Sequence, residues 1–179
     1  MRRALRCRVA DDSSPHILHR ADIEAMAGVE KVHFLNPRGR RTNKSLGDAT
    51  GLRGLGIHWI EIPADAESTE MHVHHHEDEA VYVLEGRGRV RLDEAEFELG
   101  PGDFVGLPAG GPAHVFINPG PEPLRCLVIG QRLAHDVGDY PRLGKRLYRY
   151  PRGEGSAWDL VELGDVVDPK SGNPNAGKK

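Results

Sequence analysis

The sequence predicts an all-β protein, built as an antiparallel sandwich or barrel. From residue 56 onward, short segments rich in β-branched and aromatic residues alternate with turns rich in Gly, Pro and Asp. Closely spaced short strands of this kind are typical of antiparallel sandwiches and barrels. Near the start, one short segment at residues 21–27, followed by Gly28, has the pattern of a helix.

The expected strands follow one another between these turns. They span residues 31–35, 56–62, 70–74, 79–85, 87–92, 95–99, 104–107, 114–118 and 124–130. Residues 40–55, with glycines at 47, 51 and 54, predict a loop. The run Pro101-Gly102-Asp103 predicts a turn, because Pro fits its second position and Gly its third.

The segment 87–99 shows the alternation of a hairpin. Arginines at 87, 89 and 91 share one face of the first strand, and glutamates at 94, 96 and 98 share one face of the second. The opposite faces carry Gly88, Val90 and Leu92, and then Ala95, Phe97 and Leu99. The charged faces could form an anion site with acid catalysts, but we favour an exposed ladder of cross-strand ion pairs.

The length of 179 residues fits one domain with arms at both ends. We expect an N-terminal arm with a short helix and strand over residues 1–55, a barrel over 56–130, and a C-terminal arm and polar tail over 131–179. A chain of this size buries a core without disulfides. Its two cysteines, Cys7 and Cys126, predict neither a disulfide framework nor a thiolate metal site.

Charge and hydropathy argue against several classes of function. The formal net charge of −3 gives no electrostatic case for binding nucleic acid or an anionic membrane. No apolar run approaches the length that crosses a bilayer. The first eight residues are basic but no apolar stretch follows them, so they do not predict a secretory signal. We therefore expect a cytoplasmic protein.

The residues most able to carry chemistry are histidines. Four of them stand within five positions, at 72, 74, 75 and 76, shortly before Glu79. His72 and His74 are two apart, so on a strand both imidazoles point to the same face. With Glu79 and the distant His114 they offer three imidazoles and a carboxylate, a suitable set for a divalent first-row metal. Two alternatives stay open: a polar surface loop, and a triad of His74, His76 and Glu79.

These residues resemble the two motifs of the cupin superfamily. The first motif reads His-x-His, three or four residues, Glu, six residues, Gly; residues 72–86 match it and end on Gly86. The second reads Gly, five residues, Pro-x-Gly, two residues, His, three residues, Asn; residues 102–118 match it with one extra residue between Gly110 and His114. A loop insertion of one residue is tolerable at the intervening Gly-Gly-Pro turn. Residues 46–52 and 138–141 look like a group of small single-domain cupins that are loosely called sugar-phosphate-isomerase-like.

The resemblance implies a single cupin double-stranded β-helix, or jelly-roll, barrel with N- and C-terminal arms. It also implies that a divalent metal ion (Fe, Mn, Ni or Zn) is bound by His72, His74, Glu79 and His114. The interior of a closed barrel is dry, so such a cluster is costly there unless it binds metal. A homodimer is a further implication, because cupins of this size commonly pair by their edge strands.

Strand parity predicts the walls of the pocket around this site. The residues two and four positions after Glu79 share its face, and the residue two positions after His114 shares that face. On the strand at 56–62, alternation places either His58 or Trp59 inside. The predicted substrate contacts are the inward residues, namely Val81, Val83, Phe116 and His58.

Two functions are compatible with such a site. The first is a metal-dependent enzyme of oxygenase, isomerase or lyase type, acting on a small oxygenated metabolite such as a sugar or a carboxylate compound. The second is a non-catalytic module that binds or senses a small sugar-like ligand. The sequence singles out no general acid or base.

Overall fold

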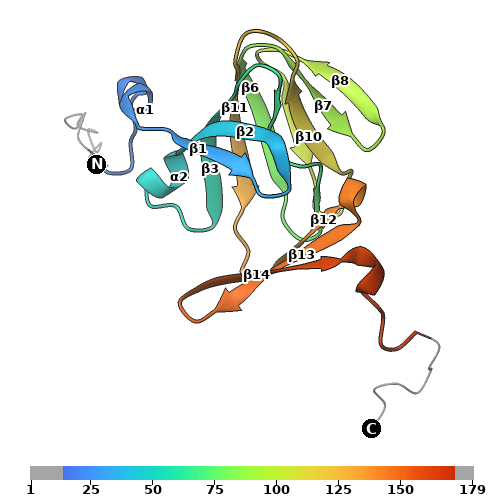
Figure 1. The fold of residues 1–179 in the computed structure, drawn as a ribbon. Helices are drawn as coiled ribbons and strands as arrows, with labels where there is room; N and C mark the ends of the chain where they lie inside the picture. The colour runs from blue at the N-terminus through green and yellow to red at the C-terminus, as the bar shows by residue number, and fades with distance from the viewer. Residues whose placement is uncertain (1–13, 172–179) are drawn as a thin grey trace, which may run out of the picture.

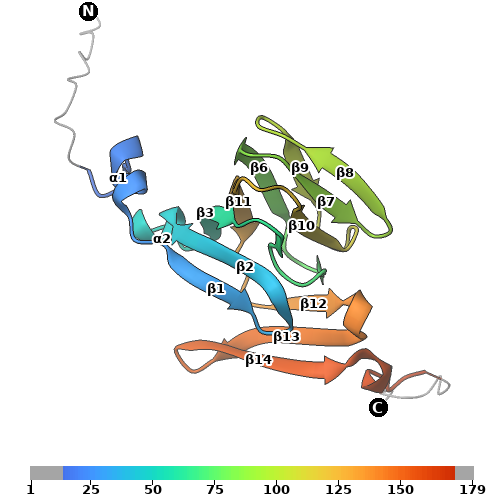
Figure 2. The same ribbon diagram turned by 45° about the horizontal axis from the view of Figure 1, so that its top comes forward.

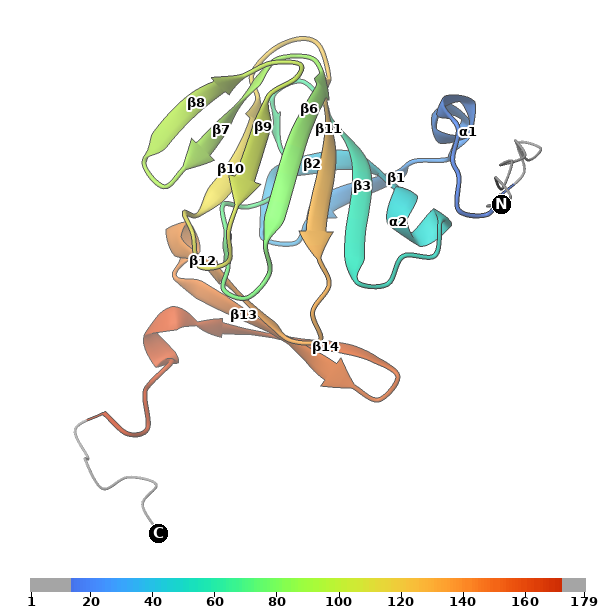
Figure 3. The ribbon, with the colours of Figure 1, turned by 180° about the vertical axis from the view of Figure 1, so that it is seen from behind.

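The structure, a computed structural model, describes residues 14–171 and is built mainly of β-strands in two sheets (Figure 1). The larger sheet has ten strands in the order β8-β7-β10-β4-β2-β3-β11-β6-β9, with β1 paired to β2. It curls round into a barrel, as the view from behind shows (Figure 3). Its strands are β1 Val29–His33, β2 Asn36–Ser45, β3 Leu55–Ile62, β4 Ala66–Glu67, β6 Glu79–Glu85, β7 Gly88–Leu92, β8 Ala95–Leu99, β9 Phe104–Leu107, β10 His114–Asn118 and β11 Leu124–Gln131.

The smaller sheet lies across one end of this barrel (Figures 1 and 2). Its order is β14-β13-β12-β5. It is formed by β5 Val73–His74, β12 Asp136–Tyr140, β13 Lys145–Arg152 and β14 Gly155–Glu162. Because β5 belongs to the histidine motif, this pairing brings the C-terminal strands next to the predicted metal site.

Short helices complete the described chain. They are α1 Arg20–Ala25, α2 Leu46–Ala49 and the 3-10 turns η1 Pro141–Leu143 and η2 Leu163–Asp165. Among residues 14–171, no helix has the length and apolar character needed to cross a membrane. Cys7, the basic start and the end of the polar tail lie outside the described residues.

The core fills the inside of the barrel and follows the predicted parity. Val81 and Val83 are 1% and 0% exposed, whereas Tyr82 between them is 41% exposed. Phe116 and Cys126 are buried in the same cluster. This confirms which faces of β6 and β10 point inward. The fold class expected from the sequence, an all-β jelly-roll barrel with additional terminal segments, is therefore confirmed.

Most of the expected strands are confirmed. Residues 79–85, 95–99, 104–107 and 114–118 form strands with the expected bounds, and the strands at 56, 87 and 124 differ by one residue at one end. In the hairpin of β7 and β8, Arg89 donates to Glu98 and Arg91 donates to Glu96. The charged faces therefore form the favoured ion-pair ladder.

Two local expectations are wrong. Residues 40–55 are not a loop, because β2 continues to Ser45 in the middle of the large sheet and α2 follows it. The alternation of apolar and polar residues does not reveal β2, because its inward residues Arg41 and Asn43 are themselves polar. Residues 70–74 form a strand only at Val73–His74, and His72 makes an isolated bridge to His114.

Candidate metal centre

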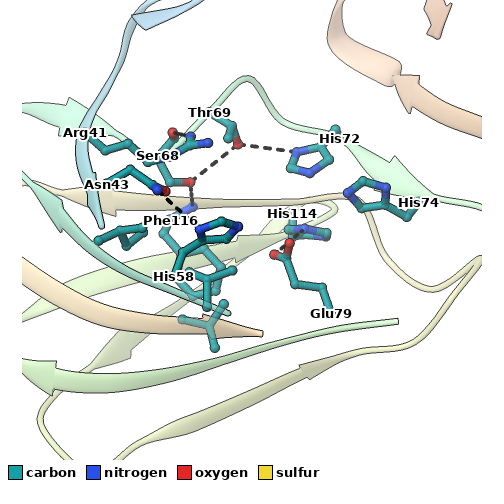
Figure 4. Close-up of a pocket in the computed structure, with 13 residues that line it drawn as sticks. Arg41, Asn43, His58, Ser68, Thr69, His72, His74, Glu79, His114 and Phe116 are labelled. Atoms are coloured by element: carbon teal, nitrogen blue, oxygen red, sulfur yellow. Dashed lines mark hydrogen bonds and ion pairs between the residues drawn. The ribbon is translucent and has the colours of Figure 1, made fainter. Parts of the chain in front are cut away.

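The four predicted metal ligands line one cavity inside the barrel (Figure 4). The cavity has a volume of about 200 Å³. Besides the three histidines and Glu79, it is lined by Arg41, Asn43, His58, Ile60, Ser68, Thr69, Val81, Phe116 and Val128. A second cavity, of about 650 Å³, shares Arg41, Thr69, His72 and His74 with the first. We call this second cavity the vestibule; its remaining lining comes from His33, Phe34, Asp136, Gly138, Tyr140, Leu147, Arg149, Trp158 and Leu160.

Backbone pairing brings the ligands together. His72 and His114 exchange two backbone hydrogen bonds, at 3.1 and 2.8 Å, and their ring centroids lie 4.5 Å apart. The ring of His74 is 4.9 Å from that of His72, and Glu79 Oε1 is 3.6 Å from His114 Nε2. The extra residue of the second motif does not displace His114, because the Gly110 amide donates to the His74 carbonyl at 2.7 Å and ties the loop down.

In each histidine, the bond made by Nδ1 leaves Nε2 available to a metal. Nδ1 of His72 lies 2.9 Å from the Glu70 carbonyl oxygen, and Nδ1 of His114 lies 3.3 Å from another backbone carbonyl oxygen. Nδ1 of His74 lies 2.6 Å from the carboxylate of Asp136. These oxygens only accept hydrogen bonds, so Nδ1 carries the proton and Nε2 of the neutral ring keeps a free lone pair.

The protonation states of His72 and Glu79 favour metal binding, whereas at His74 a metal has to compete with a proton. Burial, with the imidazoles of His114 and His74 nearby, lowers the pKa of His72 to about 3, so this ring is neutral at physiological pH. Burial works against the charge of Glu79, but the neighbouring imidazoles outweigh it and hold the pKa of Glu79 at about 2. For His74, burial is outweighed by the bonded Asp136 carboxylate, and the pKa is raised.

One buried nitrogen of this cluster makes no hydrogen bond to another side chain or to the backbone of residues 14–171. Within the described chain, Nε2 of His114 is buried and forms no hydrogen bond. Its 3.6 Å separation from Glu79 is too long for one. An unsatisfied buried polar atom costs about 1–3 kcal/mol. Three imidazole nitrogens and a carboxylate converging on one cavity fit Fe, Mn, Ni or Zn, so the residues fit a divalent metal.

Asp136 and Glu77 form a second group around His74. Ligand atoms of His74, Glu77 and Asp136 all lie within 4.8 Å of one another, so this group could also hold a metal ion. Its carboxylates, however, are already bonded. Glu77 accepts from Arg149 and from the Leu133 amide, and Asp136 accepts from His74 and the His76 amide. The Asp136 carboxylate fixes the tautomer and the orientation of the His74 ring.

The remaining predicted residues fall in three places. Val81, Phe116 and His58 line the cavity, whereas Val83 is buried in the core and is absent from the described lining. Trp59 lies on the outer face, where Lys44 stands over its ring. His76 is exposed and its side chain is not among the described lining residues, so the structure gives no support to the alternative triad.

Comparison with known proteins agrees with this fold. The family model of the cupin domain matches residues 58–130. A crystal structure from Acidithiobacillus ferrooxidans, of a protein provisionally named a sugar phosphate isomerase, is 51% identical; the match covers 86% of this chain and 96% of that one, with a TM-score of 0.81. The chain belongs to the cupin superfamily.

Two further relatives extend the comparison for this cupin. A sugar phosphate isomerase from a cupin superfamily, of Silicibacter pomeroyi, is 29% identical over 86% of this chain and 98% of that one, with a TM-score of 0.69. An uncharacterized protein of Methanocaldococcus jannaschii is 41% identical over 59 residues, which is 33% of this chain. The match spans 46% of that curated relative.

Sequence reasoning missed three residues that shape this cupin's site. Arg41 and Asn43 line the cavity from β2, the strand that the sequence hid. Asp136 comes from β12, 62 residues after the histidine that it bonds. Alternation along β12 was the available signal, since Asp136, Gly138 and Tyr140 all line the vestibule.

Proposed function

We propose that this cupin is a metal-dependent enzyme whose metal is held by His72, His74, Glu79 and His114. The observation that carries the proposal is the hydrogen bonding of the three rings. Each Nδ1 is bonded to an acceptor, so each neutral ring offers Nε2, and one of these nitrogens is buried without a partner. A bound divalent metal would act as a Lewis acid for a small oxygenated substrate.

The rest of the cavity would bind and orient that substrate. Val81 and Phe116 give it apolar walls that limit water. The amide of Asn43 donates to Nδ1 of His58 at 3.2 Å, which places the proton of the neutral ring on Nε2. Burial lowers the pKa of His58, so this ring is neutral and can donate or accept one hydrogen bond. The names of the two relatives with crystal structures support a sugar compound as the substrate class.

Metal stoichiometry tests the site. We expect about one divalent ion per chain by elemental analysis of the native protein, and loss of that ion in His72→Ala and His114→Ala. His135→Ala is the matched control, because His135 is exposed and lies outside both cavities.

A second pair of variants separates the two possible groups of ligands. If the ion sits instead between His74, Glu77 and Asp136, then Glu77→Gln will lose it while His114→Ala keeps it. That result, or an unchanged metal content in both His72→Ala and His114→Ala, contradicts the proposal.

A binding or sensing module is the second candidate function. Apart from the four ligands, the titratable side chains on the described cavity wall are Arg41 and His58, so His58 is the one candidate there for proton transfer. If the metal-loaded protein binds sugar phosphates or small carboxylates but converts none of them, the module is favoured. Turnover that falls in His58→Asn with unchanged metal content favours the enzyme.

We also propose a homodimer. The vestibule wall is apolar and partly open, since Phe34 and Trp158 are 64% and 57% exposed. A contiguous exposed apolar surface is typical of an interaction site. A second copy of this chain would cover it, and the cupin resemblance supports this occupant.

A further inference from the structure

Arg41 is the cationic side chain of the cavity wall. It points into the cavity because of its position on strand β2. Residues 41 and 43 of β2 share one face and line the cavity, whereas Lys44 lies on the other face over Trp59. In the view of Figure 4, Arg41 and Asn43 lie at one end of the cavity, and His74 and Glu79 lie at the other. Arg41 also lines the vestibule, so it stands where the two cavities join.

The guanidinium of Arg41 is poorly satisfied by the protein. Its hydrogen bond within the described chain goes to the carbonyl oxygen of Ser68, and it forms no ion pair with a carboxylate of residues 14–171. A guanidinium has five N–H donors and stays charged at any physiological pH. Burial lowers the pKa of Arg41, which reflects the cost of holding its charge there.

Other arginines of this protein are arranged differently. Four with partly covered side chains each pair with a carboxylate: Arg125 with Glu61, Arg132 with Asp48, Arg146 with Asp139, and Arg149 with Glu77. A buried charge without a partner is destabilising, so it persists where a ligand supplies the opposite charge. Arg41 is therefore placed as an anion receptor rather than as a structural ion pair.

We propose that Arg41 binds an anionic group of the substrate, a phosphate or a carboxylate, while oxygen atoms at the other end of the same molecule reach the metal. The contact with the metal rests on the proposed function, whereas the contact with Arg41 does not. The hydroxyl of Thr69 lines both cavities beside Arg41 and can donate to the same anion. The planar pair of N–H donors of an arginine fits a phosphate and a carboxylate equally well. The site therefore specifies a negatively charged group but does not distinguish between these two anions.

Anion binding to the full-length protein tests this directly. Inorganic phosphate and, in a separate arm, acetate are titrated by calorimetry or NMR into metal-free and zinc-loaded protein. We expect at least one of them to bind in both forms, at least tenfold more weakly in Arg41→Gln, and with an intermediate affinity in Arg41→Lys. Arg40→Gln is the matched control, because Arg40 is the exposed neighbour on the same strand.

The outcomes separate this inference from the metal assignment. Equal affinities of native protein and Arg41→Gln overturn it, as does the absence of anion binding to both native forms. If Arg41→Gln does not fold, the comparison of Arg41→Lys with native protein decides in the same way. If zinc fails to bind but phosphate or acetate binding still depends on Arg41, the metal proposal falls and the anion site stands.

Discussion

At the scale of single residues, the orientation of His74 depends on a side chain from the neighbouring strand of the smaller sheet. The Asp136 carboxylate lies 2.6 Å from Nδ1 of His74, and its second oxygen accepts from the His76 amide. It is also 5% exposed, so water does not weaken the interaction. A carboxylate in this position orients the ring and raises the basicity of Nε2.

Replacing this carboxylate tests its positioning role. We expect Asp136→Asn to lower metal affinity by about 10–100-fold, because the amide orients the ring but removes the charge. Competition with a chromophoric chelator measures the affinity, and thermal unfolding checks that the fold is kept. Asp139→Asn is the control, since Asp139 bonds His75 and Arg146 and contacts none of the four proposed ligands. Equal affinities of Asp136→Asn and native protein contradict the role.

At the scale of elements, the motif glycine after β6 has a steric reason. Gly86 has φ +81°, and a Cβ there would collide with the backbone carbonyl oxygen of Pro123. Gly102 has φ +94°, but no atom lies within 4 Å of the position of its Cβ. Both glycines belong to cupin motifs. Gly86 is required by its positive φ and by the close approach of Pro123, whereas Gly102 is required by its positive φ alone.

This difference predicts unequal costs of substitution. Gly102→Ala should lower the free energy of unfolding by about 1–2 kcal/mol, because an L-residue is strained at positive φ. Gly86→Ala should cost clearly more, since the β6–β7 turn must also move away from Pro123. Denaturant unfolding of both variants measures the two values. Equal losses would show that the contact with Pro123 is relieved without cost.

The elements also show what sequence can and cannot predict. The barrel strand β6 was predictable because its apolar residues alternate between a core face and an outer face, whereas β10 is buried on both faces and was predictable from its apolar run between turns. The spacing of the two cupin motifs predicted that His72 and His114 belong to one site. β2 was not predictable by alternation, since its inward Arg41 and Asn43 serve a polar cavity.

At the scale of the whole molecule, the C-terminal segment completes the site. β12 pairs with β5, so that Gly138 lies opposite His74. This pairing spans more than 60 residues and is set by tertiary contacts, which local sequence patterns do not encode. The result is a small polar chamber for the proposed metal, opening into a larger vestibule with aromatic walls.

The open vestibule leads to the last prediction, which concerns assembly. We expect light scattering at micromolar concentration to give twice the monomer mass of 19.7 kDa. A stable interface of this kind buries on the order of 1,000 Å² or more, and exposed aromatic residues often contribute its strongest contacts. Trp158 on β14 lies at the vestibule, so Trp158→Asp should shift the protein toward monomer.

Phe104→Asp is the matched control for this assembly. Phe104 is 66% exposed on β9, the strand at the far edge of the large sheet, and it lies outside the vestibule. If Phe104→Asp yields monomer and Trp158→Asp does not, the subunits pair through the β9 edge and the vestibule stays open. A native protein with the mass of one chain at all micromolar concentrations would rule out both arrangements. If Trp158→Asp alone gives monomer, the partner subunit covers the aromatic wall of the vestibule.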